Sequence, residues 1–279
     1  MRAVRYSHDG GEPRLGRLDG DTVVDAGAAP PEGFVPSGEG WGRIAAASGD
    51  PAPVAGVRLL HPTVPRSLIA IGLNYRDHAA ESELEIPAVP VVFAKLPSAL
   101  VGHDAPIVVP REETRPDYEG EVGVILGRTV YRASAEEARS AVGGITCLHD
   151  VSGRRAQLET PLRQFTLGKS FDTFSPMGPC VARADDLDLD AIGIRTVVSG
   201  ETMQDSSTAN LIFSIVDLVA YCSAGVTLEA GTVIATGTPG GVGAGRTPPR
   251  FLEDGEVVVT TIAGLGEQRN RCRREVLPG

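Results

Sequence analysis

The sequence predicts an α+β protein that is rich in β-strands, and two observations support this fold class. Short runs of β-branched and other apolar residues recur along the chain between glycine, proline and aspartate, which is typical of strands. Few segments show the longer apolar periodicity of helices, and the sequence contains no internal repeats. Many strands with few helices favour a β-rich α+β domain over a regularly alternating α/β fold.

Residues 1–62 are expected to form a small N-terminal β-rich domain. Strand patterns such as AVRY and TVVDAG are followed by a glycine- and proline-rich stretch, GAAPPEGFVPSGEGW. The segment GDPAPVAGVRLLHPTVPR is interpreted as a linker, because its prolines and glycines disfavour regular structure. Residues 63–279 are expected to form the main domain, since a chain of 279 residues can build one large core and a smaller unit.

The main domain is predicted to alternate many strands with three helices. Strands are predicted, in order, at SLIAIGLNY, VVFAK, PIVVP, EGEVGVILG, GGITCLHDVS, IRTVVSGE, TVIATG and EVVVTTIAGLG. Helices are predicted at RDHAAESELE, at SAEEARSAV, where a serine can cap the first turn, and at NLIFSIVDLVAYCSAG.

Composition argues against several classes of protein. The net charge of −10 argues against nucleic acid as the main partner, because phosphate binding needs surplus cations. No run of eighteen apolar residues exists, so no membrane span is expected, and the start MRAVRYSHDGGEP lacks the pattern of a signal peptide. The four cysteines lie far apart without a CxxC pair, which favours reduced thiols in a cytoplasmic protein.

Lysine is rare in this chain. Of the 26 basic residues, only Lys95 and Lys169 are lysines. Where arginine is used almost everywhere, a remaining lysine can mark a place that needs a compact, deprotonatable ammonium. The alternative is that both lysines persist on the surface by chance.

Two carboxylates stand at the beginning of the apolar strand in DYEGEVGVILG. Side chains alternate along a strand, so Glu119 and Glu121 share one face, roughly 6.5–7 Å apart at Cα. Carboxylates at this spacing can hold one hard cation, and Gly123 leaves space beside them. Oxygen ligands without a histidine or cysteine cluster favour Mg²⁺, Mn²⁺ or Ca²⁺ over zinc. An exposed acidic strand end is the alternative interpretation.

A third carboxylate, Asp150, ends the predicted strand GGITCLHD. Aspartate is well suited to cap a helix, so a structural role is one interpretation. An acid followed by clustered donors could instead hold a metal beside an anionic ligand. The donors that follow within twenty residues are Arg154, Arg155, Gln157, Arg163 and Lys169.

The segment YRDHAAES carries a candidate general base. His78 and Glu81 are three residues apart and face each other on a helix, so the carboxylate can orient the imidazole. Such pairs are also common on protein surfaces, where they have no catalytic role.

Two glycine-containing motifs do not fit nucleotide-binding patterns. LGKS lacks the first glycine of a P-loop, because position 163 is arginine, and TGTPGGVGAG lacks the GxGxxG spacing, because position 246 is arginine. The second motif is better interpreted as a loop that offers backbone donors and the hydroxyls of Thr236 and Thr238 to a ligand, or as a plain turn.

Together these motifs resemble the fumarylacetoacetate hydrolase family over about residues 66–272. Seven pieces occur in the family's order: IGLNYRDHAAES, FAKLPSALVG, DYEGEVGVILG, HDVSGRRAQ, LGKSFDTFSPMGPC, ATGTPGGVG and AGLGEQ. Within the family the chain is most similar to the bacterial branch that acts on 2-oxo and 2,4-dioxo acids, including acylpyruvate and diketo-deoxy-sugar-acid hydrolases.

The resemblance implies a fold, an assembly and a set of site residues. It implies a mixed β-roll core with a small N-terminal domain, a homodimer, and one Mg²⁺ or Mn²⁺ (or Ca²⁺ in a crystal) held by Glu119, Glu121 and Asp150. His78 and Glu81 match the family's water-activating pair, on a segment that often acts as a lid. The positions that match substrate-binding residues are Tyr75, Arg154, Gln157, Lys169 and Thr238, and Lys169 is also expected to take part in catalysis.

The chain departs from the family's usual sequence around Asp150. The family usually has asparagine, alanine and an acidic residue where this chain has His149, Gly153 and Arg155. His149 could tune the metal through another ligand or simply pack, and Arg155 could bind an extra substrate charge or lie on the surface.

The leading functional hypothesis is metal-assisted hydrolysis of a C–C bond in a 2,4-dioxo acid, a small anionic substrate. The metal would stabilise the enolate that leaves, and His78, oriented by Glu81, would deprotonate the attacking water. A decarboxylase of an oxaloacetate-like acid, a hydratase and a tautomerase need much of the same chemistry. A non-catalytic module that binds oxo acids is the alternative from a different class of protein.

Overall fold

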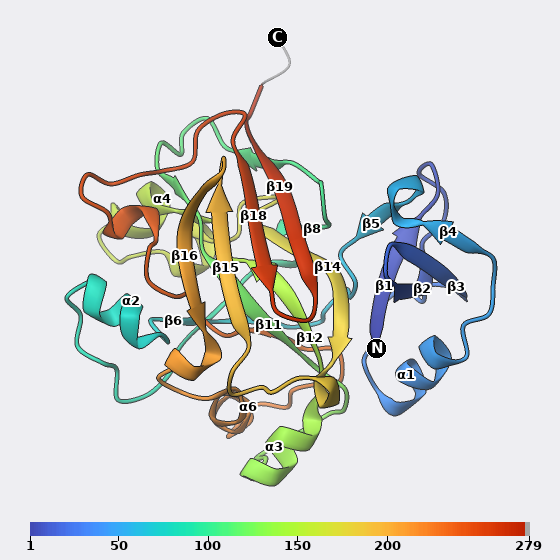
Figure 1. The fold of residues 1–279 in the computed structure, drawn as a ribbon. Coiled ribbons are helices and arrows are strands. Elements are labelled where there is room, and N and C mark those ends of the chain that lie inside the picture. Colours follow the sequence, from blue (N-terminus) through green and yellow to red (C-terminus); the bar gives the residue numbers. More distant parts are fainter. Residues whose placement is uncertain (277–279) are drawn as a thin grey trace.

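The computed structural model describes residues 1–276 and has the predicted α+β, β-rich fold (Figure 1). Most strands belong to one twelve-stranded sheet, in which β5 (Arg58–Leu60) also pairs with β1 and β8 (Leu100–Val101) with β14. The order along the sheet is β4 (Pro51–Pro53), β3 (Thr22–Ala28), β2 (Arg14–Asp19), β1 (Arg2–Ser7), β14 (Ser175–Arg183), β12 (Val142–His149), β11 (Gly120–Leu126), β17 (Val233–Ala235), β6 (Leu68–Gly72) and β7 (Val91–Ala94).

A second sheet packs over the middle of the first. Its order is β16 (Glu201–Ser207), β15 (Gly193–Val198), β18 (Val257–Ile262), β19 (Gly266–Arg274) and β9 (Ile107–Val109). Figure 1 shows β15 and β18 lying across β11 and β12, and β15 contacts β11 while β18 contacts β12. A short ladder of β10 (Pro116–Asp117) and β13 (Ser152–Gly153) lies just before β11 and just after β12 in the chain.

The helices are short and lie at the margins of the sheets. They are α1 (Gly38–Ala45), α2 (Arg76–Glu81), α3 (Ala135–Ala141), α4 (Arg154–Leu158), α5 (Phe165–Gly168) and α6 (Ile215–Cys222). The predicted serine cap of α3 is confirmed, because Ser134 and Glu137 form a capping box. No helix among residues 1–276 is long and apolar enough to cross a membrane.

The helix predicted over residues 210–225 is shorter in the structure. Ser214 and Asp217 form a second capping box, so α6 begins at Ile215 rather than within the apolar residues before it. Leu211 instead pairs with Tyr75 in an isolated bridge.

The N-terminal region is joined to the main body through the large sheet. β1 pairs with β14, with Arg2 opposite Ala182, so the sheet continues from one region into the other. The predicted linker is wrong in part: residues 51–53 form β4, which pairs with β3, and residues 58–60 form β5, which pairs with β1. Leu59 is buried in this pairing, and its burial stabilises the strand. The prolines and glycines on either side had predicted irregular structure.

The three longest strands that escaped prediction have sequences that lack the usual apolar alternation. β14 contains Pro176 and Pro179, and Pro179 falls where its register with β12 shifts. β19 buries the polar residues Gln268 and Asn270 between exposed charged ones, so hydrophobicity does not alternate along it. β16 is similarly polar.

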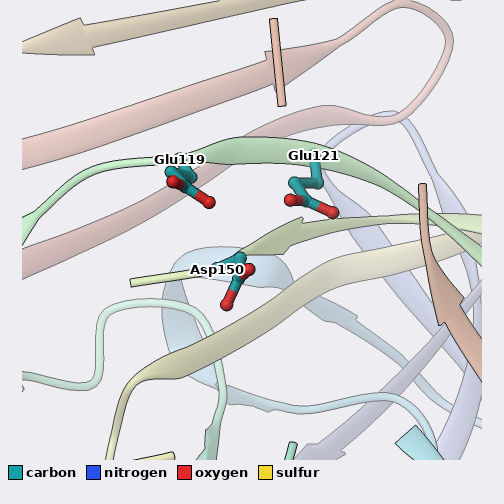
Figure 2. A group of neighbouring side chains, drawn as sticks. All are labelled: Glu119, Glu121 and Asp150. Carbon is teal, nitrogen blue, oxygen red and sulfur yellow. The ribbon is translucent and has the colours of Figure 1, made fainter. Parts of the chain in front are cut away.

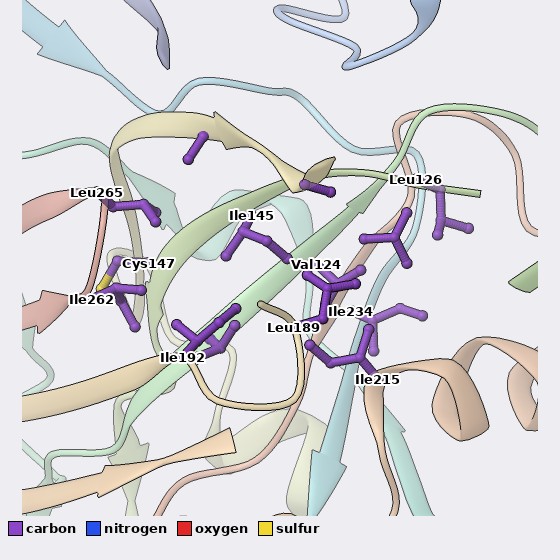
Figure 3. Close-up of a cluster of buried hydrophobic side chains, with 14 of the residues drawn as sticks. Val124, Leu126, Ile145, Cys147, Leu189, Ile192, Ile215, Ile234, Ile262 and Leu265 are labelled. Carbon is purple, nitrogen blue, oxygen red and sulfur yellow. The ribbon is translucent and has the colours of Figure 1, made fainter. Parts of the chain in front are cut away.

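The main core lies between the two sheets (Figure 3). Val124 and Leu126 of β11 pack in one cluster with Ile145 and Cys147 of β12 and with residues of the second sheet. Ile125 belongs to a different cluster on the opposite face of β11. The predicted alternation of this strand is therefore confirmed, and it fixes the face on which Glu119 and Glu121 lie.

Candidate active site

Three carboxylates meet where β11 begins and β12 ends. Each of Glu119, Glu121 and Asp150 offers an oxygen within 4.8 Å of the others, and Figure 2 shows both glutamates pointing toward the strand end that carries Asp150. The antiparallel pairing of Gly120 with His149 places them together, and Asp150 donates its backbone N–H to the carbonyl of Glu119 at 2.8 Å. All three side chains are buried, so their charges need compensating partners.

Lys169 supplies one compensating charge. Its Nζ lies 2.5 Å from Oε2 of Glu119 and 2.6 Å from Oδ2 of Asp150, so the ammonium bridges two members of the triad. Burial by itself would lower the pKa of Lys169, but the carboxylates of Asp150 and Glu119 outweigh that effect and raise it. Lys169 is therefore held as a cation.

Lys95 is the other lysine, and its place at the site was not predicted. Its Nζ donates to Oδ1 of Asp150 and to the backbone carbonyl of Lys169. Burial lowers the pKa of Lys95, and Asp150 offsets part of that effect. Both lysines of the chain therefore meet at Asp150, which agrees with the functional interpretation of their rarity.

Arg154 joins the triad to the residues around it. Its Nη2 lies 2.6 Å from Oε1 of Glu119, its Nε donates to Oδ2 of Asp117 at 2.8 Å, and its Nη1 donates to Oε1 of Gln157 at 2.9 Å. Burial lowers the pKa of Arg154, but Asp117 and Glu119 raise it by more. The predicted pair Arg154 and Gln157 thus lies at the triad as one hydrogen-bonded unit.

Asp117 is a buried residue of the site that sequence reasoning missed. Besides Arg154, its carboxylate accepts the backbone N–H groups of Gly243 at 2.7 Å and Ala244 at 3.0 Å. It therefore ties the arginine to the glycine-rich loop. The only sequence indication was an acid two residues before Glu119.

The three carboxylates are electrostatically unequal. Burial raises the pKa of Glu119, but Lys169 and Arg154, with a smaller contribution from His78, lower it to well below its ordinary value. The pKa of Glu121 is raised well above its ordinary value by burial and then by Asp150 and Glu119. Glu121 accepts one N–H, from Gly237 at 2.9 Å, and remains the least compensated acid.

This donor set fits a hard divalent cation. It consists of buried carboxylate oxygens, which such ions prefer, and an ammonium already lies among them. The raised pKa of Glu121 indicates that the three carboxylates carry more negative charge than their cationic partners compensate, so additional positive charge would be favourable there. The triad could therefore bind a metal.

His78 and Glu81 form the predicted pair on α2. Nδ1 of His78 lies 3.2 Å from Oε1 of Glu81, whose Oε2 accepts the N–H of Gly241 at 2.5 Å. Asp77 fastens the same helix, because its carboxylate accepts from the N–H of Gly240 at 3.2 Å and from the hydroxyl of Ser206 at 2.7 Å. The pair is thus held by the glycine-rich loop, and His78 contributes to the field at Glu119.

Two further residues predicted to bind the substrate, Thr238 and Tyr75, differ in their hydrogen bonding. The Thr238 hydroxyl donates to the carbonyl of Gly120 at 2.9 Å and accepts from Nε2 of Gln204 at 2.7 Å. Tyr75 is buried in the core, and its hydroxyl has no hydrogen-bond partner within residues 1–276. Burial and then Glu121 raise the pKa of Tyr75, which places the phenol within the field of the triad.

The departures from the family pattern have different surroundings. His149 is buried, and burial lowers its pKa to about 4, so it is uncharged at neutral pH. Its Nε2 has no partner in the part of the chain that the structure describes. Arg155 is exposed on α4 and donates to the backbone carbonyl of Glu112, away from the triad.

Comparison with known proteins identifies the family. The family model described as fumarylacetoacetate (FAA) hydrolase C-terminal matches residues 67–273, and one described as Rv2993c-like, N-terminal matches residues 1–62. The mitochondrial oxaloacetate tautomerase fahd2 of Xenopus laevis is 37% identical over 97% of this chain and 89% of its own length. The oxaloacetate tautomerase YisK of Bacillus subtilis (strain 168) is 43% identical over 76% of this chain and 72% of its own.

A solved structure extends the similarity over both regions. The fumarylacetoacetate hydrolase of Exiguobacterium antarcticum is 35% identical, and the two structures match with a TM-score of 0.83 over 99% of this chain and 100% of the other. From the extent of the family match and of these similarities, the chain belongs to the fumarylacetoacetate hydrolase family.

Proposed function

We propose that this protein is a divalent-metal-dependent enzyme that moves a proton between C3 and the 2-oxo oxygen of a small 2-oxo acid. Its main reaction would be the tautomerisation of an oxaloacetate-like acid. The observation that carries the proposal is the buried triad of Glu119, Glu121 and Asp150 with Lys169 bridging it and the His78–Glu81 pair held nearby. The names of two similar proteins as oxaloacetate tautomerases favour this reaction over the alternatives.

The proposed cofactor is Mg²⁺ or Mn²⁺, held by Glu119, Glu121 and Asp150. When bound there, the ion would supply positive charge that stabilises an oxyanion on the substrate. All three ligands are oxygens, which suits these two ions better than zinc.

The substrate would be fixed by the cationic and amide side chains beside the triad. Arg154 and Gln157 would offer guanidinium and amide N–H groups to a carboxylate, and charge-assisted hydrogen bonds from them would orient a planar oxo acid. Lys169 would donate a hydrogen bond to the 2-oxo oxygen, where negative charge develops when C3 loses a proton.

His78 would move the proton. Its Nδ1 is bound to Glu81, which leaves Nε2 to accept a proton from C3 of the oxo acid. The C–H electron pair then forms the C2–C3 double bond, and the carbonyl pair moves onto oxygen, which takes a proton to give the enol. The reverse sequence returns the keto form, so no water is consumed.

A second candidate reaction is hydrolysis of a C–C bond in a 2,4-dioxo acid. The similarity to a solved fumarylacetoacetate hydrolase favours it, as does the same histidine–glutamate pair, which can activate water. His78 would take a proton from water, hydroxide would add to the distal carbonyl, and the bond to C3 would break to leave an enolate. Product identity separates the two reactions.

The test is a comparison of substrates with the purified protein and Mg²⁺ or Mn²⁺. Keto–enol exchange of oxaloacetate is followed by ultraviolet absorbance, and fragments from an acylpyruvate are identified by proton NMR. Buffer with the same metal and no protein is the control, because divalent metals alone promote both enolisation and decarboxylation of oxaloacetate. Tautomerisation above this control supports the first reaction, and two acid fragments support the second. If neither reaction exceeds the metal control, the proposed function is rejected.

A further inference from the structure

The helix that carries Arg154 and Gln157 does not cap its own N-terminus. α4 follows Gly153, which provides no side-chain cap, and its first turn contains no acidic residue. The first backbone N–H groups of such a helix need partners from elsewhere.

Glu113 supplies these partners from a distant part of the chain. Its Oε1 accepts the N–H of Arg155 at 3.1 Å and that of Arg115 at 2.8 Å, and its Oε2 accepts the N–H of Ala156 at 3.0 Å. Glu113 is 2% exposed, and within residues 1–276 the hydrogen bonds of this buried carboxylate all come from backbone N–H groups. It provides the negative charge that the first turn of α4 lacks.

Gly153 makes room for this carboxylate. A Cβ at position 153 would lie 2.7 Å from Oε2 of Glu113 and 2.9 Å from Cε2 of Phe171. The backbone φ of Gly153 is −81°, which any residue can adopt, so the glycine is not required by its conformation. Its smallness therefore serves the contact with Glu113, which a Cβ would crowd.

The position of α4 matters because the helix is packed against the segment that carries Lys169. A Cβ at Gly168 would lie 2.7 Å from Cβ of Gln157, so the two segments are in close contact. A shift of α4 would therefore change the spacing between Lys169 on one side and Arg154 and Gln157 on the other.

We propose that Glu113 is a positioning residue that, together with Gly153, fixes α4 and thereby the two side chains that bind the substrate. This inference rests on the proposed function, in which Arg154 and Gln157 hold the substrate carboxylate. Glu113 does not contact the oxygens of the triad, so replacing it should change the affinity for the substrate and not the affinity for the metal.

The experiment uses Glu113→Gln, with the exposed neighbour Glu112→Gln as matched control. Hydrogen exchange at the amides of Arg155 and Ala156 should become about tenfold faster in Glu113→Gln, the effect of losing a capping contact. KM for the 2-oxo acid should rise about tenfold, with kcat changed less than about threefold, because substrate binding is affected more than chemistry. The affinity for Mg²⁺, measured by calorimetry without substrate, should not change.

Gly153→Ala tests the same contact with the native carboxylate present. It should raise KM as Glu113→Gln does, and it serves if Glu113→Gln does not fold. In the double variant the rises in KM and in exchange rate should not multiply, because each substitution alone already disrupts the contact between the Glu113 carboxylate and the same N–H groups. Unchanged exchange and KM in both single variants, or multiplied effects in the double variant, would overturn the proposal. Faster exchange in a protein whose wild type turns over no oxo acid would support the cap and reject the proposed function.

Discussion

Replacing Lys169 by methionine should destabilise the metal-free protein strongly. The ammonium is buried and lies 2.5 Å from Glu119 and 2.6 Å from Asp150, so methionine removes one cation from each of these buried carboxylates and leaves Glu119 with Arg154 and Asp150 with Lys95. Removing one member of a buried ion pair costs about 3–5 kcal/mol. For a chain of this size each kcal/mol corresponds to roughly 2–4 °C, so the melting temperature should fall by roughly 6–20 °C.

The same variant should bind a divalent metal more tightly than the wild type. The ammonium and a metal ion are both attracted by the oxygens of Glu119 and Asp150, so removing the ammonium removes a competitor and a repulsive charge. An affinity gain of about tenfold corresponds to only about 1.4 kcal/mol, which is less than the interaction removed. Saturating Mg²⁺ should therefore recover more of the melting temperature in Lys169→Met than it adds to the wild type.

Thermal unfolding by circular dichroism and calorimetric titration with Mg²⁺, both after chelation of bound metal, measure these effects. Arg128→Met is a suitable control, because it removes an exposed cation that donates to Ser140 on the surface. If metal-free Lys169→Met unfolds at the wild-type temperature, or if its Mg²⁺ affinity does not rise, the ammonium does not occupy the position of a cation among the carboxylates.

Three further predictions concern single side chains. His78→Ala should lose turnover by about 10²-fold or more while Mg²⁺ affinity stays the same, since a positioned base contributes that much; retained turnover would remove His78 from the mechanism. The raised pKa of Glu121 means that its proton stabilises the folded state at low pH and that this stabilisation is lost as pH rises through the raised value. Glu121→Gln should therefore unfold at a higher temperature than the wild type in metal-free buffer at neutral pH, yet bind Mg²⁺ more weakly; a lower unfolding temperature would contradict the pKa direction. The carboxylate of Asp25 accepts hydrogen bonds from Tyr6 and Arg14, and the bond from Arg14 lowers the pKa of Asp25 to about 2 although burial opposes this shift. The ionised carboxylate therefore stabilises the folded protein above the ordinary aspartate pKa, and this stabilisation is lost as pH falls toward 2. Asp25→Asn should cost about 1–3 kcal/mol in urea unfolding at pH 7 and much less near pH 2; an equal cost at both values would show that the charge is not responsible.

The three carboxylates of the triad could be predicted from the sequence because they lie in or next to two strands with clear apolar patterns. Glu119 and Glu121 share a face by strand alternation, and the pairing of β11 with β12 brings Asp150 beside them. Lys95, Asp117 and Glu113 were not predicted to act at the site. Their partners lie tens of residues away, and only the folded chain reveals which carboxylate meets which amide.

The fold was predicted where hydrophobicity alternates and missed where it does not. β6, β11, β12 and β18 follow apolar patterns, and all were expected. β19 buries amides and β14 contains prolines, so neither resembles a strand until neighbouring strands supply its hydrogen bonds. Propensity is a weak guide when tertiary pairing determines the structure.

The pairing of β1 with β14 also has a consequence for synthesis of the chain. Arg2 cannot meet Ala182 until the ribosome has made both, which takes roughly 10–40 s at about 5–20 residues per second. During that time β1 has β2 and β5 as partners, but its N-terminal end remains an open strand edge that can associate with other chains. A chain that begins at residue 63 would leave the matching edge of β14 open instead, so we expect it to aggregate unless its sheet is covered by another strand. The N-terminal region thus covers the edge of β14 once the large sheet is complete.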